Sequence, residues 1–180
     1  KLYSVFNYSG SILQSFELYS LHKESNELIN FIDKTFNIES MKGVQKDISV
    51  LYLIYKAKLL KRNNKIKDAK LLFEQLFKES NVVEALENSK VDIIHTSILR
   101  LVVPELYEIY ALENNYAKIN SITQAFFKKN ASQLKKRDLD DLHIYLSLNS
   151  IKIYKSLLIY FENSNNKKQF KIVAKHVDKH

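Results

Sequence analysis

The segment 57–77, AKLLKRNNKIKDAKLLFEQLF, consists of two apolar, lysine-rich stretches on either side of a polar break. The break, KRNNK at 61–65, contains neither glycine nor proline. Asparagine, however, tolerates the left-handed backbone conformation and caps helices, so it can reverse the chain where glycine usually does. The pattern predicts a helical hairpin, with helices over 46–62 and 65–79 that bury facing apolar stripes.

The same pattern recurs along the chain. Three segments, 55–77, 105–127 and 156–177, align on their asparagine-containing turns at a spacing of about 50 residues. Each carries a bulky residue shortly before the turn and an apolar residue nine positions further on. These pairs are Leu60 and Ala69, Tyr110 and Ile119, and Phe161 and Phe170, with a looser copy at Tyr19 and Leu28.

Apolar periodicity predicts helices over most of the remaining chain. The expected hairpins span 11–36, 46–79, 91–129 and 138–178, with a loop at 40–47, a short extra turn within 80–90 and a basic connector at 130–137. Pro104 falls inside a helix, so we expect a kink or a new helix start there. The acidic run DLDD at 138–141 suits a helix N-terminus, and we expect one long helix from it to about 163. Only two glycines and one proline are present, too few for strands and their turns. We therefore expect an all-α fold of about 8–9 helices in a single domain over 1–180.

The segment 51–80 resembles the tetratricopeptide repeat, a helix-turn-helix unit of many scaffold proteins. Ala57 and Ala69 stand at its two small positions, Phe73 at its aromatic position and NKI at 64–66 in its turn. The resemblance implies stacked hairpins in a right-handed superhelix. The later copies depart from the family, because the spacing exceeds 34 residues, no proline ends a unit and bulky side chains replace the small ones. Those bulky residues are Tyr107, Ile119, Leu158 and Phe170. An unrelated antiparallel bundle with similar turns is the alternative.

In tetratricopeptide arrays, ligand peptides lie along the inner face formed by the first helix of each unit. The resemblance carries this role to positions on three helices. They are Leu51, Ile54, Lys58, Lys61 and Arg62, then Leu101, Glu108 and Leu112, and finally Lys152, Lys155, Ile159 and Asn163. The implied groove is apolar with positive ends, and it suits a peptide with acidic groups or a free carboxylate, anchored by Tyr and Phe side chains. The Lys/Asn clamp that binds chaperone carboxylates is not reproduced. The alternative is that several of these lysines lie along the outer surface.

Little in the sequence indicates catalysis. There is no cysteine, glycine-rich phosphate loop or nucleophile elbow. The acidic run 138–141 lies close to His143, but acids in a first helical turn usually complement the helix dipole. His176 and His180 are four residues apart, and we expect a solvated tail there rather than a metal site. We expect no enzyme activity, no metal and no cofactor.

The chain is basic, with a formal net charge of +8. Only three of its 28 basic residues are arginines, and the abundance of lysine beside asparagine and isoleucine resembles the codon bias of an AT-rich genome. The lysines nonetheless cluster at two places. These clusters are Lys128, Lys129, Lys135, Lys136 and Arg137, and Lys167, Lys168, Lys171, Lys175 and Lys179. Such patches bind phosphate backbones by counterion release, so nucleic-acid or acidic-membrane binding is an alternative to a merely solvated surface.

The leading interpretation is a non-catalytic scaffold module that binds a protein or peptide ligand, with a preference for an acidic one. An unsealed end of the stack would favour a homodimer. No apolar run reaches the ~18 residues of a membrane helix, and no signal-peptide pattern is present, which favours a cytoplasmic location. The chain begins with Lys1 and is compatible with a piece of a longer protein. The peptide-sensing half of a transcriptional or signalling regulator is therefore the second interpretation.

Overall fold

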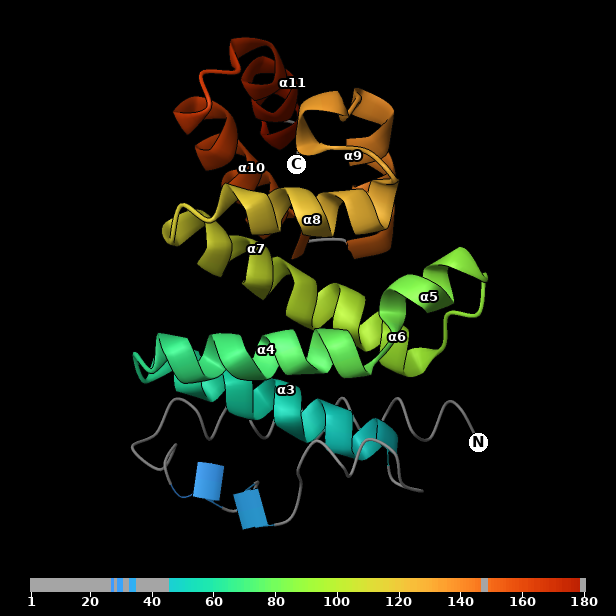
Figure 1. Ribbon diagram of the computed structural model, residues 1–180, viewed down its shortest axis with the longest axis vertical. Coiled ribbons are helices and arrows are strands. Elements are labelled where there is room, and N and C mark those ends of the chain that lie inside the picture. Colours follow the sequence, from blue (N-terminus) through green and yellow to red (C-terminus); the bar gives the residue numbers. More distant parts are fainter. Residues whose placement is uncertain (1–26, 28, 31–32, 35–45, 147–148, 179–180) are drawn as a thin grey trace. The chain divides into compact units, whose positions relative to one another are not determined.

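The computed structural model describes residues 27, 29–30, 33–34, 46–146 and 149–178 (Figure 1). The chain divides into two compact units, Lys1–Glu79 and Ser80–His180. Every regular element among the described residues is helical, which confirms the all-α prediction. The hairpin predicted over 11–36 lies outside the described residues except for 27, 29–30 and 33–34, which are helical. The loop predicted at 40–47 also lies outside them, apart from its end, where a helix has already begun at Lys46.

In the first unit, helices α3 (Lys46–Arg62) and α4 (Ile66–Glu79) pack against each other as a hairpin, and their bounds agree with the sequence prediction. Ala57 and Ala69 are fully buried, and side chains this small allow two helix backbones to approach closely. The buried residues of α4 recur with the helical period and are all apolar. They are Ala69, Leu72, Phe73 and Leu76.

The turn between α3 and α4 is closed by two backbone hydrogen bonds. Lys65 N–H donates to Leu60 O at 2.9 Å, and Asn64 N–H donates to Lys61 O at 3.1 Å. This pair of bonds ends a helix around one left-handed residue, a position that glycine usually occupies. Here the left-handed residue is Asn64, with φ of 61°. The asparagine therefore has the role that the sequence predicts.

Two further turns repeat the same geometry in the second unit. Asn115 donates to Tyr110 and Asn114 to Ala111, and Asn166 donates to Phe161 and Asn165 to Glu162, at distances between 2.8 and 3.1 Å. The left-handed residues are Asn114 and Asn165, with φ of 54° and 52°. The next residues, Asn115 and Asn166, cap the following helices, since their side chains accept backbone N–H bonds from Lys118 and Gln169. The three aligned turns of the sequence are thus one structural motif.

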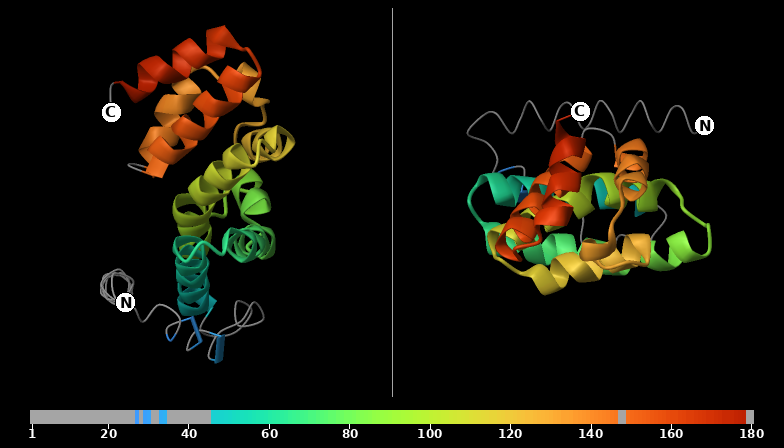
Figure 2. Two further views of the ribbon diagram at one scale, coloured as in Figure 1. Left: turned by 90° about the vertical axis from the view of Figure 1, so that its left-hand side faces the viewer. Right: turned by 90° about the horizontal axis from the view of Figure 1, so that it is seen from above.

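The second unit contains two hairpins and several shorter elements. In chain order these are α5 (Val82–Glu87), α6 (Ile93–Ser97), a π-helical segment (Ile98–Val102), α7 (Val103–Leu112), α8 (Tyr116–Phe127), a 3-10 turn (Ala131–Gln133), α9 (Lys136–Leu146), α10 (Ser150–Asn163) and α11 (Lys167–Val177). Helices α7 and α8 form one hairpin, and α10 and α11 form the other (Figures 1 and 2). Within this unit, α10 also packs against α7, and α11 packs against α9.

Pro104 changes the helix as expected. Proline has no backbone N–H, so it cannot complete the α-helical pattern of the preceding turn. The chain becomes π-helical just before it, where Val103 N–H donates to Ile98 O, five residues back. An α-helix starts again at Val103, with Pro104 in its first turn. The wider π turn accommodates the missing donor without ending the helical path.

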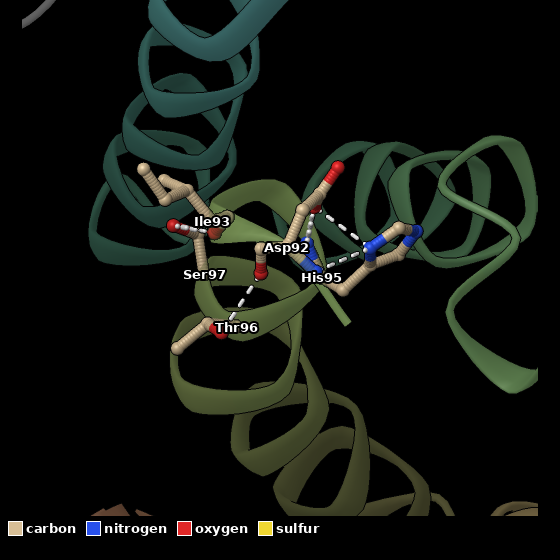
Figure 3. A network of polar contacts seen from close by, with 5 residues as sticks. All are labelled: Asp92, Ile93, His95, Thr96 and Ser97. Atoms are coloured by element: carbon tan, nitrogen blue, oxygen red, sulfur yellow. Dashed lines mark hydrogen bonds and ion pairs between the residues drawn. The ribbon is translucent and has the colours of Figure 1, made fainter. Parts of the chain in front are cut away.

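A reciprocal cap starts α6 (Figure 3). Asp92 Oδ1 accepts from His95 N–H at 3.0 Å, and His95 Nδ1 accepts from Asp92 N–H at 3.1 Å. Each side chain thus satisfies a backbone donor that the helix end leaves open. The hydroxyls of Thr96 and Ser97 donate to Asp92 O and Ile93 O, both at 2.9 Å. His95 therefore has a structural role at a helix start.

The single long helix predicted from 138 to about 163 is wrong. Helix α9 ends at Leu146, and α10 begins at Ser150 after Asn149. The two helices pack against each other, so α9 precedes the last hairpin rather than extending it. Asn149, directly before α10, makes no side-chain cap, and residues 147–148 lie outside the described part of the chain. Among the described helices, none is long and apolar enough to cross a membrane.

Candidate functional site

Lys152 of α10 connects the first helices of the two hairpins in the second unit. Its Nζ lies 2.5 Å from Glu105 Oε1 and 3.5 Å from Glu108 Oε2, both on α7. The Glu105 side chain is only 9% exposed, and a carboxylate at that depth needs charged or hydrogen-bonding partners. This bridge holds α10 against α7. It also brings together Glu108 and Lys152, two of the residues that the sequence assigned to a peptide groove.

The bridge joins two stripes of side chains, which we call the α7–α10 face. Its residues are Leu101 in the π-helical segment, Glu105, Glu108 and Leu112 on α7, and Lys152, Lys155, Ile159 and Asn163 on α10. On each helix the spacing follows the helical period, so each stripe runs along one side. Leu112 is 68% exposed, so this face includes an apolar side chain that is open to solvent. Lys155 and Asn163 are exposed, whereas Leu101 and Ile159 are half-buried.

The predicted groove residues of α3 have a different setting. Ile54 is fully buried, and a buried side chain offers no surface to a ligand, so we remove it from the site. Leu51, Lys58 and Lys61 are half-buried, and Arg62 is exposed. The assignment of these four to a groove stays a prediction.

The aromatic side chains serve mainly the core. Phe73, Tyr107, Tyr154 and Phe161 are each 1% exposed or less. These four side chains are therefore core residues, and the expectation that Tyr and Phe anchor a partner stays a prediction. Burial raises the pKa of Tyr107 well above its ordinary value, although the hydrogen bond with Thr123, at 2.7 Å, works in the opposite direction.

A polar contact around Tyr160 links α8 to the last hairpin, and no motif in the sequence indicated it. The rings of Tyr116 and Tyr160 lie 5.3 Å apart, and Asn120 Nδ2 donates to Tyr160 Oη at 3.0 Å. The carbonyl oxygen of the same amide accepts from Ala131 N–H at 3.1 Å. Asn120 thus fixes both α10 and the chain that follows α8.

His176 does not belong to a solvated tail, so that expectation is wrong for it; His180 lies outside the described residues. The His176 imidazole is 1% exposed, stands edge-on to the Tyr154 ring at 4.9 Å, and has Nδ1 3.4 Å from Asp140 Oδ1. Burial raises the pKa of Tyr154 to about 12. The negative charge of Asp140 also raises this pKa, whereas a hydrogen bond with Ser150 lowers it. Helices α9, α10 and α11 therefore meet around polar side chains.

The pairing of His143 with Ser150 is closed to a substrate. His143 Nδ1 lies 3.1 Å from Ser150 Oγ, a pairing that resembles a nucleophile and its base. Ser150, however, is fully buried in the structure. Within the described residues, no group of three His, Asp or Glu side chains converges as a metal ion would require.

Asp138 stabilises the start of α9, as the sequence predicts. Its carboxylate accepts from Lys135 N–H at 2.7 Å and from Lys129 Nζ at 2.7 Å. Burial acts to raise the pKa of Asp138, but these two bonds and the two lysine charges outweigh it and lower the pKa below its ordinary value. Asp138 is therefore a helix cap and ion-pair partner.

Comparisons with protein-family models, curated proteins and solved structures give no significant match. Function is therefore inferred from the geometry of the α7–α10 face.

Proposed function

We propose that this chain is a non-catalytic helical-repeat module that binds a protein or peptide segment along the α7–α10 face. Its hairpins would be stacked in the manner of tetratricopeptide units, with first helices that line the binding surface. The repeated turns support this arrangement, because α7 and α10 each precede a turn of the same geometry. The packing of α7 against α10 supports it further.

The single observation that carries the proposal is the exposed Leu112 on the same stripe of α7 as the Lys152 bridge. Lys152 and Glu105 hold each other in place, so the surface is arranged before a ligand arrives. A pre-arranged surface loses little entropy on binding. Leu112 supplies apolar area that a partner can cover, at about 25 cal/mol per Å² of apolar surface removed from water.

The charges of the face indicate the ligand. Lys155 is exposed on α10 and favours an acidic group, in keeping with the sequence prediction. Glu108, 38% exposed, favours a basic group instead. Lys152 is already paired with two carboxylates and contributes little net charge. The matching ligand is a short amphipathic segment with an apolar centre and charges of both signs, rather than a purely acidic tail.

The test begins with a selection of peptides from a random library on the immobilised chain. The affinity of a selected peptide is then measured by fluorescence anisotropy for the native chain and for Leu112→Lys. We expect an affinity loss of about tenfold or more, since the change places a charge where an apolar contact should form. Leu71→Lys is the matched control, because Leu71 is also a leucine on the exposed side of a helix, 58% exposed on α4.

Equal losses in the two variants, or no loss in either, would exclude the α7–α10 face as the binding surface. Circular dichroism of both variants checks that the helices are intact.

A further inference from the structure

The positive charge of the chain is concentrated near its C-terminus. Residues 128–180 contain 12 basic and 5 acidic residues, whereas 80–127 contain 3 basic and 6 acidic residues and 1–79 contain 13 basic and 9 acidic residues. Their formal charges are therefore +7, −3 and +4, which make up the +8 of the whole chain. A codon bias would spread lysine more evenly. The concentration calls for a local explanation.

The first group of charges lies on a folded connector rather than on a loose loop. The connector side chains Ala131 and Leu134 are buried, and Asn130 and Gln133 form a reciprocal cap in which Asn130 N–H donates to Gln133 Oε1 at 3.2 Å. The exposed basic residues that flank this turn are Lys128, Lys135, Lys136 and Arg137, which we call the connector cations. The fixed backbone holds these charges in a defined arrangement.

The second group lies along α11. Its exposed lysines Lys167, Lys168, Lys171 and Lys175, which we call the α11 row, occupy the side of the helix opposite its buried residues. Three of them recur every fourth residue, so their Cα atoms are about 6 Å apart along the helix.

One hydrogen bond joins the two segments that carry these charges. Gln169 Nε2 of α11 donates to Ser132 O of the connector at 2.6 Å, and Lys168 precedes Gln169 directly. Further along, α11 packs against α9, whose first turn contains Lys136 and Arg137. Figure 1 shows α11 beside α9 at the end of the unit. The connector and α9 therefore pack against the buried side of α11, which places both groups of cations at the same end of the unit.

We propose that the connector cations and the α11 row form one surface that binds the phosphate backbone of duplex nucleic acid without reading its sequence. Lysine suits this task, because it is a point charge that neutralises phosphates, whereas base recognition relies on arginine, asparagine or glutamine in a groove. Each neutralised phosphate releases counterions, which makes the affinity strongly dependent on salt.

A duplex fits this surface better than a single strand or a lipid bilayer. The connector contains no aromatic residue, and Phe170 of α11 is half-buried, so neither offers an open ring for unpaired bases. A helix that inserts into a membrane surface needs a free apolar side. On α11 that side is used within the protein, since Val173 is fully buried.

The test measures the anisotropy of two labelled duplexes of unrelated sequence between about 50 and 200 mM salt. The native chain is expected to bind both duplexes equally, with the logarithm of the affinity falling linearly with the logarithm of the salt concentration. The variant K168Q/K171Q/K175Q should bind about tenfold more weakly at the lowest salt, with a salt slope shallower by about 2 to 3. Glutamine keeps the helix propensity of lysine, so α11 should remain folded.

The matched control is K65Q/K67Q/K78Q, which removes the same number of exposed charges from α4 and the turn before it. It should leave duplex affinity nearly unchanged. An equal loss in the two variants would show that only net charge matters and would overturn the proposal. Failure to bind duplexes would also overturn it, as would binding to phosphatidylserine vesicles alone.

Discussion

Helices α4 and α11 follow turns with the same hydrogen bonds, yet they bury different side chains. The buried residues of α4 are all apolar, whereas those of α11 are Gln169, Val173 and His176. The buried side of α8 is intermediate in polarity, because it consists of Ile119, Ile122 and Thr123. The turn is a local structure that depends on a few consecutive residues. The buried side depends on the neighbours of the helix, and for α11 these include a connector carbonyl and Asp140.

The largest expected effect concerns the apolar side of α4. Phe73 is fully buried, so Phe73→Ala should reduce the free energy of unfolding by about 3–5 kcal/mol. Phe170, in the first turn of α11, is half-buried. Phe170→Ala should therefore lower the free energy of unfolding by less than half the amount expected for Phe73→Ala. Urea unfolding of both variants, followed by circular dichroism, makes the comparison. Similar losses would mean that the two helices are packed alike.

Tyr154 of α10, whose ring packs against His176 on the polar side of α11, predicts a pH effect that α4 lacks. Tyr154 has its pKa raised from 10.0 to about 12, so the folded state favours the neutral phenol. The resulting stability is fully present below pH 10 and is lost as the pH rises through about 12, with a size of up to about 3 kcal/mol. Denaturant unfolding across this pH range measures the loss. Tyr154→Phe should make that part of the pH dependence disappear, and an unchanged profile would contradict the assignment.

A smaller effect is expected in the α7–α8 hairpin, where one buried hydroxyl pair replaces purely apolar contact. Tyr107 Oη and Thr123 Oγ1 lie 2.7 Å apart, and Thr123 Oγ1 also donates to Ile119 O at 2.7 Å. Tyr107→Phe should cost about 1 kcal/mol, because Thr123 keeps one of its two hydrogen bonds. A thermal melt detects the change. If the free energy of unfolding fell by several kcal/mol, the α7–α8 hairpin would depend strongly on the hydroxyl pair. It would then resemble the α10–α11 hairpin with its polar contacts.

The turns could be predicted from the sequence because their cause is local. A pair of asparagines between two apolar periodic stretches is enough to place the left-handed residue, as at Asn64 and Asn114. The bounds of α3 followed from the same periodicity. The break between α9 and α10 was missed because serine and asparagine do not interrupt the apolar pattern as glycine or proline would.

The sites depend on contacts that spacing cannot reveal. Lys152 and Glu105 belong to different hairpins, and only the packing of α10 on α7 pairs them. His176 reads as part of a charged C-terminus, since nothing local indicates that α9 and α10 will enclose it. The family resemblance predicted a groove along these helices, and the structure places Lys152 Nζ 3.5 Å from Glu108 Oε2 on them. The groove itself stays a prediction.

The central claim is that left-handed asparagines at Asn64, Asn114 and Asn165 form the three hairpins, and substitution at these positions tests it directly. Each asparagine is replaced in turn by glycine and by valine, and the free energy of unfolding is measured by urea titration. Glycine should be tolerated within about 1 kcal/mol, whereas valine, which strongly disfavours positive φ, should cost about 1–2 kcal/mol more than glycine at all three positions. Equal stability of the glycine and valine variants would contradict the claim.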